Sequence, residues 1–299
     1  LQFYPTKSTV NDYDLSVFSY NLNDNFLGIG TTSLGGVATI ETKSSPVTSG
    51  VTTTIVSIGD THTSVKVLVD INPDLTRNEE FEAIELNIVH DGTNIEMLEY
   101  GRLTTNLGGS AAPGPGTYHA YFSASSLNVD FIPTSVGIAT TGVINTIQVG
   151  LSTNTITGIG TIDLTRSRLE ARTTSISASG SPGINTVAEY PNNYDAAYFI
   201  AQVTDTTNTS TQLSELIIVD DYVSSTESYQ TYDTEYGVIE TGVGLGTFGS
   251  RVSAAGTVSL VFTPNASIDT VVNIYMNALT LNENTSLSNV IDFTNATIN

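Results

Sequence analysis

The sequence contains no cysteine, few basic residues and no long apolar run. Without cysteine, its 299 residues can form neither a disulfide framework nor a thiolate metal site, so stability must come from packing and strand pairing. No apolar run approaches the roughly 20 residues that span a membrane, and no signal peptide opens the chain. The apolar spacing of about 3.6 that indicates a helix is nowhere sustained.

The charge is strongly one-sided. Nine Lys and Arg residues face 30 Asp and Glu residues, which gives a formal net charge of −21, and no lysine follows Lys66. Nucleic-acid binding needs a basic stripe that neutralises phosphates, and an anionic membrane surface would repel this chain. We therefore predict neither nucleic acid nor membrane as a partner, and we interpret the acidity as a source of solubility in a long particle or filament.

A single sequence unit recurs about every 130 residues. Phe131-Ile132-Pro133 returns as Phe262-Thr263-Pro264, and Phe3-Tyr4-Pro5 matches the same position. Three further pairs of segments keep the same order: residues 85–91 and 215–221, residues 99–101 and 235–237, and residues 28–31 and 158–161. The sequence therefore predicts an extended array of modules, with boundaries near Gly28 and Gly158.

The repeat predicts the domain organisation. We expect residues 28–157 to be one repeat and residues 158–281 the next. Residues 1–27 are interpreted as the C-terminal part of a preceding repeat, and residues 282–299 as a linking strand or the start of a further repeat. Because residue 1 is Leu rather than Met, we expect the chain to be a piece of a longer protein.

Apolar residues alternate with their neighbours in several segments. The alternating residues are Val65, Val67, Val69 and Ile71, then Ile84, Leu86 and Ile88, and in the second unit Phe199, Ala201 and Val203, followed by Leu216 and Ile218. A period of two indicates half-buried strands, and turn clusters rich in Gly, Pro and Asn separate them at short intervals. The predicted fold class is all-β, with tandem antiparallel β-sandwich modules of an Ig-like or jelly-roll-like kind.

Several repeated residues are predicted to shape the fold. His90-Asp91-Gly92-Thr93 is typical of a tight hairpin turn, because Gly tolerates positive φ. The second unit has a longer insertion there, through Ser228, where a binding loop could lie. Pro5, Pro133 and Pro264 are predicted to end strands.

Tyr100 and Tyr236 each follow a Glu and precede a Gly. We interpret them as core or corner residues whose hydroxyl groups bond to the backbone, with a sugar-stacking platform as the alternative.

The second unit carries a resemblance to a known kind of module. Residues 214–221, then Glu235-Tyr236-Gly237, Leu245-Gly246-Thr247-Phe248 and residues 258–264, resemble a β-module that recurs in structural proteins of tailed bacteriophages. The first unit carries the same pattern, except that the Pro/Gly loop at residues 113–116 replaces the Leu-Gly-Thr-Phe stretch. Residues 28–32 are similar to the low-lysine, Gly/Thr-rich style of marine phage virion proteins. The resemblance covers nearly the whole chain and implies a virion scaffold or fibre role without enzymatic residues.

The residue types that carry catalysis are scarce or scattered. His62, His90 and His119 are too few and too isolated in sequence for a multi-histidine site, and the position of His90 holds Asp220 in the second unit. No Gly-x-Ser-x-Gly motif is present. We assign no catalytic, cofactor-binding or metal-ligating residue and no cofactor.

Carboxylates are abundant, so pairs of them arise by number alone. Glycoside cleavage would need two converging carboxylates, for which Glu99 with Asp91 and Glu235 with Asp233 are candidates. The acidic pairs at residues 79–80 and 220–221 could help hold Ca²⁺, but no spaced Asp-x-Asp-x-Asp loop accompanies them. We interpret these pairs as solvated turn charges.

The preferred function is a non-enzymatic structural protein of a tailed-phage virion, in a fibre, a tail appendage or a capsid-associated array. The alternative is a cellular extracellular filament, surface-layer or adhesin-like repeat protein, and a polysaccharide depolymerase is third. Glycosylation would favour the cellular alternative, and the Asn-x-Ser/Thr sequons are at Asn208, Asn265, Asn284 and Asn295.

The expected partners are other copies of the chain in a homo-oligomer and other virion proteins, with host-surface glycans as a further candidate. The expected location is the virion, with the cell surface as alternative. We predict that the Thr/Ser/Val/Ile stretches at residues 52–58 and 140–150 are neutral faces for lateral association, with contacts that tighten with salt.

Overall fold

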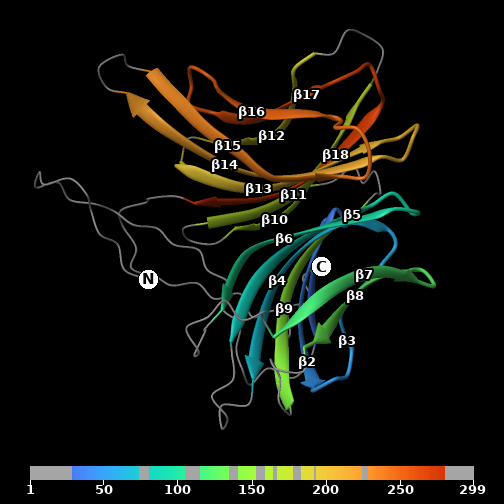
Figure 1. Cartoon of the computed structure of the whole chain (residues 1–299). Coiled ribbons are helices and arrows are strands. Elements are labelled where there is room, and N and C mark those ends of the chain that lie inside the picture. The colour runs from blue at the N-terminus through green and yellow to red at the C-terminus, as the bar shows by residue number, and fades with distance from the viewer. Residues whose placement is uncertain are drawn as a thin grey trace, which may run out of the picture.

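The computed structural model of the chain describes residues 29–73, 81–104, 115–134, 141–152, 159–163, 167–177, 183–191, 193–223 and 228–279. Their strands form two modules, drawn one above the other in Figure 1. Module 1 consists of strands β1 to β9 and module 2 of strands β10 to β18. The predicted segments 1–27 and 282–299 lie outside the described residues, and the predicted repeats 28–157 and 158–281 each contain the strands of one module.

The two modules have the same topology. The strands of module 1 are β1 (Ile29–Leu34), β2 (Ala38–Thr48), β3 (Thr53–Gly59), β4 (His62–Pro73), β5 (Glu82–His90), β6 (Ile95–Thr104), β7 (Gly116–Ser123), β8 (Ser126–Pro133) and β9 (Thr141–Ser152). The strands of module 2 are β10 (Ile159–Asp163), β11 (Ser167–Ile176), β12 (Asn185–Tyr190), β13 (Ala196–Asp205), β14 (Thr211–Val223), β15 (Ser228–Glu240), β16 (Gly246–Val252), β17 (Val258–Pro264) and β18 (Thr270–Leu279).

Each module pairs a large antiparallel sheet with a small one. The large sheets have the orders β1-β2-β9-β4-β5-β6 and β10-β11-β18-β13-β14-β15, and the small sheets have the orders β3-β8-β7 and β12-β17-β16. The nine strands of one module therefore correspond one to one with those of the other. The predicted fold class is confirmed: the chain is all-β, with two tandem antiparallel sandwich modules.

Alternation along the strands builds a separate core in each module. Between the sheets of module 1 lie Val65, Val67, Val69, Ile71, Ile84, Leu86 and Ile88, and between those of module 2 lie Phe199, Ala201, Val203, Leu216 and Ile218. These are the residues that the period of two predicts to be buried. Phe131 and Phe262 are fully buried in the two cores, and each contributes about 2 kcal/mol by removing its ring from water.

Glycine and proline mark equivalent places in the small sheets. Strands β8 and β17 end at Pro133 and Pro264, as predicted, whereas Pro5 lies outside the described residues. Gly116 and Gly246 pack directly under the rings of Phe131 and Phe262, where an added Cβ atom would lie 2.3 Å and 2.4 Å from ring carbons. The two modules therefore match at Gly116-Thr117-Tyr118 and Gly246-Thr247-Phe248. This corrects the sequence interpretation, which placed a departure from the repeat here.

The β5–β6 turn is tight, as predicted. The Asp91 carboxylate accepts the backbone N–H groups of Thr93 and Asn94 at 2.8 Å and 2.7 Å, and Gly92 has a φ of +92°. In module 2 the corresponding strands continue to pair as far as Val223 and Ser228. The insertion there lengthens the hairpin instead of forming only a loop, and residues 224–227 are not described.

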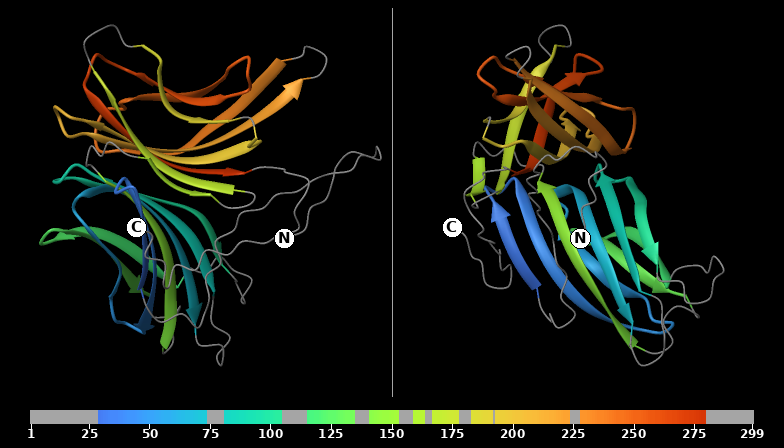
Figure 2. Two further views of the ribbon diagram at one scale, coloured as in Figure 1. Left: turned by 180° about the vertical axis from the view of Figure 1, so that it is seen from behind. Right: turned by 90° about the vertical axis from the view of Figure 1, so that its left-hand side faces the viewer.

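The large sheets of the two modules pack face to face. Figures 1 and 2 show these sheets next to each other, with the small sheets on the sides away from the contact. A third apolar cluster lies between them, and its members include Ile40, Ile147, Val149 and Leu151 of module 1 and Leu169, Ile200, Leu213 and Tyr275 of module 2. This arrangement differs from the predicted extended array because the outer face of each large sheet also carries apolar residues, which the contact buries. No helix long and apolar enough to cross a membrane occurs in the ranges described above.

Candidate functional site

The polar centre of the contact between the modules is the candidate site. Its framework is the repeated Glu-Tyr-Gly motif, which forms a β-bulge in each large sheet. Gly101 and Gly237 have φ values of +63° and +60°, and the pairing register shifts beside them. A glycine in this left-handed conformation lets one strand hold an extra residue. The bulges set Tyr100 opposite Glu85 and Tyr236 opposite Glu215.

Lys66 reaches the contact from β4. Its neighbours Val65 and Val67 point into the core of module 1, so Lys66 points to the other face of the sheet. It pairs directly with Asn87 of β5, which lies on the same outer face. The cation and the amide therefore stand side by side where module 2 covers the sheet.

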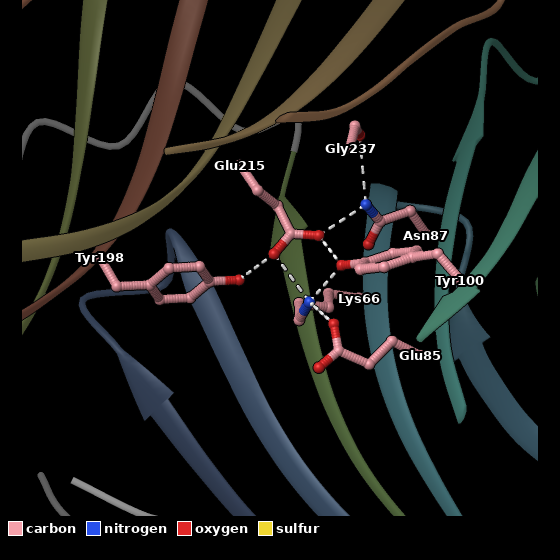
Figure 3. Close-up of polar contacts among 7 residues, drawn as sticks. All are labelled: Lys66, Glu85, Asn87, Tyr100, Tyr198, Glu215 and Gly237. Carbon is pink, nitrogen blue, oxygen red and sulfur yellow. Dashed lines mark hydrogen bonds and ion pairs between the residues drawn. The ribbon is translucent and has the colours of Figure 1, made fainter. Parts of the chain in front are cut away.

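The side chain of Glu215, on β14 of module 2, points toward Lys66 and Asn87 of module 1 (Figure 3). Its carboxylate accepts hydrogen bonds from Lys66 Nζ at 2.7 Å, from Asn87 Nδ2 at 2.7 Å, and from the hydroxyl groups of Tyr100 and Tyr198. Two donors therefore serve each oxygen. The Glu215 side chain is 1% exposed, so these bonds replace its hydration almost completely.

Lys66 joins the two modules. Besides Glu215, its ammonium group binds Glu85 of module 1 at 2.6 Å and the Tyr100 hydroxyl. It also lies 4.9 Å from the ring centre of Tyr100 and 5.9 Å from that of Tyr198, within reach of a cation–π attraction. One cation therefore faces two carboxylates, of which Glu85 is partly exposed and Glu215 is buried.

Burial and charge shift the pKa values in opposite directions. Burial raises the pKa of the Glu215 carboxyl above its ordinary value, and Lys66 and Asn87 oppose that rise. Burial lowers the pKa of Lys66, but Tyr198, Glu215 and Glu85 outweigh it, so the pKa ends above its ordinary value. Burial, reinforced by Glu215, raises the pKa of Tyr236 to about 12. Lys66 is therefore charged and Tyr236 neutral at physiological pH.

A cavity of about 170 Å³ adjoins this cluster. Its polar lining consists of Lys66, Glu85, Tyr198, Glu215 and Tyr236, and its apolar lining consists of Leu68, Ile147, Val149 and Ile200. Residues from both modules form its walls. The cavity therefore exists only while the large sheets face each other.

Other contacts tie the modules together away from the cluster. Ser64 donates a hydrogen bond to the Gln202 side chain, and Asn273 donates one to the backbone carbonyl of Ser152. Gly35 and Gly160 bring the backbones so close that a Cβ atom added to Gly160 would lie 2.2 Å from the Gly35 nitrogen. The contact is thus continuous from the polar centre to the strands β1 and β10.

The structure gives Tyr100 and Tyr236 a different role from the predicted one. The Tyr100 hydroxyl bonds to Glu215 of the other module instead of to a backbone group, and Tyr236 lines the cavity. Lys66 and Asn87 were not assigned a role by sequence reasoning. Two sequence signals were available for this cluster: Lys66 is the last lysine of the chain, and Glu85 and Glu215 occupy matching positions of the repeat.

Two of the three histidines meet. His90 Nε2 donates to the backbone carbonyl of His62 at 2.8 Å, and burial lowers the pKa of both side chains. His119 lies elsewhere and stacks on Tyr121 with 5.7 Å between ring centres. Within the described residues, no group of three or more His, Cys, Asp or Glu side chains is placed to hold a metal ion.

The candidate carboxylate pairs have separate local partners. Glu99 pairs with Arg102 at 2.8 Å, while the carboxylate of Asp91 is bound within the β5–β6 turn. Asp233 accepts the Ser250 hydroxyl at 2.5 Å, and Glu235 accepts the backbone N–H of Phe248 at 3.4 Å. These bonds hold β15 against β16.

The prediction that Asp220 and Asp221 are turn charges is wrong. Both residues lie within β14, where they pair with Thr231 and Gln230 of β15. Burial, reinforced by Asp195, raises the pKa of Asp220 to about 6. The pair at residues 79–80 lies outside the described residues.

The two stretches proposed as lateral faces both send apolar side chains into the interior of the chain, although Thr52 and Ser57 of the first stretch are exposed. In β3, Ile55, Val56 and Ile58 belong to the core of module 1. In β9, Ile144 joins that core, and Ile147 and Val149 pack between the modules. The second stretch is therefore mostly unavailable for lateral association, whereas association through the first stretch stays a prediction; residue 140 is not described.

Two sequons lie on the surface. Asn208 and Asn265 are exposed, and their side-chain amides donate to Asp205 and to the backbone carbonyl of Gly244, each at 2.8 Å. Asn284 and Asn295 lie outside the described residues.

Comparison with protein-family models, with curated proteins and with solved structures finds no match for the chain. At the polar centre, amine, amide, hydroxyl and carboxylate groups bind one another across two modules. That chemistry stabilises a fixed arrangement of two sandwiches.

Proposed function

We propose that the chain is a non-enzymatic structural protein of a tailed-phage virion, in a fibre, a tail appendage or a capsid-associated array. The proposal depends on the observation that the Glu215 carboxylate accepts hydrogen bonds across the contact between the modules. Three of its donors, Lys66, Asn87 and Tyr100, belong to the other module. Such a group stiffens the connection between repeated modules, which is what a spacer or scaffold requires.

The virion assignment itself depends on the sequence resemblance and on the acidic, repeated character of the chain. In this role the partners are other copies of the chain and other virion proteins, and outward loops could contact host-surface glycans. The test is to purify particles on a density gradient and quantify the intact chain beside capsid and tail-tube proteins by mass spectrometry. A fixed ratio to those proteins supports the proposal. Absence from intact particles contradicts it.

The second candidate is a cellular extracellular filament, surface-layer or adhesin-like protein. The exposure of Asn208 and Asn265 is the observation that favours it. Glycan mass on either asparagine in protein taken from a cell envelope would decide for this alternative. A polysaccharide depolymerase ranks third, and release of sugars from host polysaccharide by the purified chain would place it first.

A further inference from the structure

Equivalent strands of the two modules meet each other in the contact. Strand β5 contacts β14, β6 contacts β15, β9 contacts β18 and β1 contacts β10. Glu85 and Glu215 hold the same place in their sheets, since they pair with Leu68 and Ile200 respectively. The contact therefore approximates a two-fold interface, in which the same surface patch is used on both sides.

Lys66 and Tyr198 are equivalent as well. Lys66 lies two residues before Leu68, the strand partner of Glu85, and Tyr198 lies two residues before Ile200, the strand partner of Glu215. The Lys66 ammonium lies over the Tyr198 ring, so the pseudo-two-fold axis passes close to these two residues. At this position the modules differ in charge: module 1 has a cation and module 2 has none.

Glu215 therefore has to take its cation from the partner sheet. Within the described part of module 2, Arg168 and Arg172 are bound to Glu170, and Arg251 is exposed on the small sheet. Two copies of module 2 that met through this face would bury two Glu215 carboxylates without a lysine. A buried charge that loses its partner is strongly unfavourable.

We propose that Lys66 is the specificity-determining residue of the contact. The outer face of the module 2 large sheet recognises a sheet that brings one cation to Glu215, which is module 1, and it rejects a second copy of module 2. The same rule governs pairing within one chain and between two copies of the chain. This inference goes beyond the proposed function and does not depend on the virion assignment.

The test starts from the intact, folded chain. A protease site is inserted between Ser152 and Ile159, and the chain is cut into its two modules after purification. Native mass spectrometry and size-exclusion chromatography should show that the cut modules stay together in a one-to-one complex. In Lys66→Met the dissociation constant should rise at least about 100-fold, because Glu215 loses its cation while remaining buried. Lys66→Arg should keep most of the affinity, since it keeps the charge.

Lys43→Met is the matched control. Lys43 is a partly buried lysine of the same module, but it bonds to the backbone carbonyl of Thr54 in the small sheet. Its loss should leave the affinity between the cut modules unchanged. Circular dichroism of each variant verifies that the modules remain folded.

A gain of pairing tests the same rule from the other side. Wild-type module 2, dissociated from module 1 with urea after cutting and refolded alone, should remain a monomer. Tyr198→Lys places a cation at the equivalent position, so this variant of module 2 should pair with itself. In the cutting experiment, the proposal is overturned if the wild-type modules separate on cutting or if Lys66→Met binds as tightly as wild type. In the module 2 experiment, it is overturned if wild-type module 2 forms a dimer or if the Tyr198→Lys variant of module 2 stays a monomer.

Discussion

Replacing Lys66 by Met should destabilise the chain in a manner that depends on pH. The substitution keeps an unbranched side chain of similar reach but removes the only cation bound to Glu215 among the described residues. The Glu215 side chain stays buried, with Asn87, Tyr100 and Tyr198 as its remaining donors. Removal of one partner from a buried ion pair costs about 3–5 kcal/mol, and we expect about 3 kcal/mol at pH 8 because those donors persist.

The pH dependence follows from the carboxyl that is left behind. Burial already raises the pKa of Glu215 in the presence of Lys66, and loss of the cation raises it further. The folded variant then binds a proton at a pH where the unfolded chain does not, so its stability increases as the pH falls. The difference between Lys66→Met and wild type should therefore shrink by half or more between pH 8 and pH 5.

Urea unfolding followed by circular dichroism measures this difference at both pH values. Each module has its own core, so the first transition is the one to compare when two are resolved. The double variant Lys66→Met/Glu215→Gln carries no buried charge at this place and should recover most of the loss at pH 8. A loss that is equal at both pH values, or a double variant as unstable as the single one, would show that the buried Glu215 charge is not the cause of the instability.

Three further predictions concern the same interface and its surroundings. Gly237→Ala should cost more stability than Gly101→Ala. Both residues have positive φ, but only at Gly237 does an added Cβ atom meet the interface, 3.0 Å from Asn87 Nδ2. Thermal unfolding of the two variants measures the difference, and equal losses would contradict it. Raising the pH above about 10 should destabilise the chain, because the raised pKa values of Lys66 and Tyr236 mean that the folded state keeps protons that the unfolded state releases; urea unfolding at pH 8 and pH 10.5 checks the sign. Asp220→Asn should stabilise the chain at pH 7.5 by about 1 kcal/mol, discounted for the partial exposure of the carboxyl, and should have less effect at pH 4, where the carboxyl of the folded wild type is already protonated.

The sequence predicts most of each module but not how the modules meet. Alternation at Val65, Val67 and Val69 assigns one face of β4 to a core, and the structure confirms it. The same alternation leaves Lys66 and Leu68 on the other face without saying whether water or another sheet covers that face. The period of two reports the direction of a side chain, and it does not report what lies beyond the sheet.

Most residues of the site are noticeable in the sequence because they repeat, whereas in the structure they matter because they meet between the modules. Glu85, Glu215, Tyr100 and Tyr236 stood out because they repeat, and repetition alone suggested a role inside each module. The structure shows that equivalent residues of the repeat gather in one contact between modules. Lys66 breaks the repeat, and a residue that differs between two matching units cannot be interpreted until the units are placed against each other.

Small-angle X-ray scattering of the intact chain tests the face-to-face arrangement most directly. We expect a pair-distance distribution with a single maximum for the wild type, because the two large sheets are in contact, and a broader distribution for Lys66→Met at pH 8. A wild-type distribution with a second, longer maximum would show two modules joined end to end. That result would contradict the claim that Lys66 and Glu215 hold the modules together.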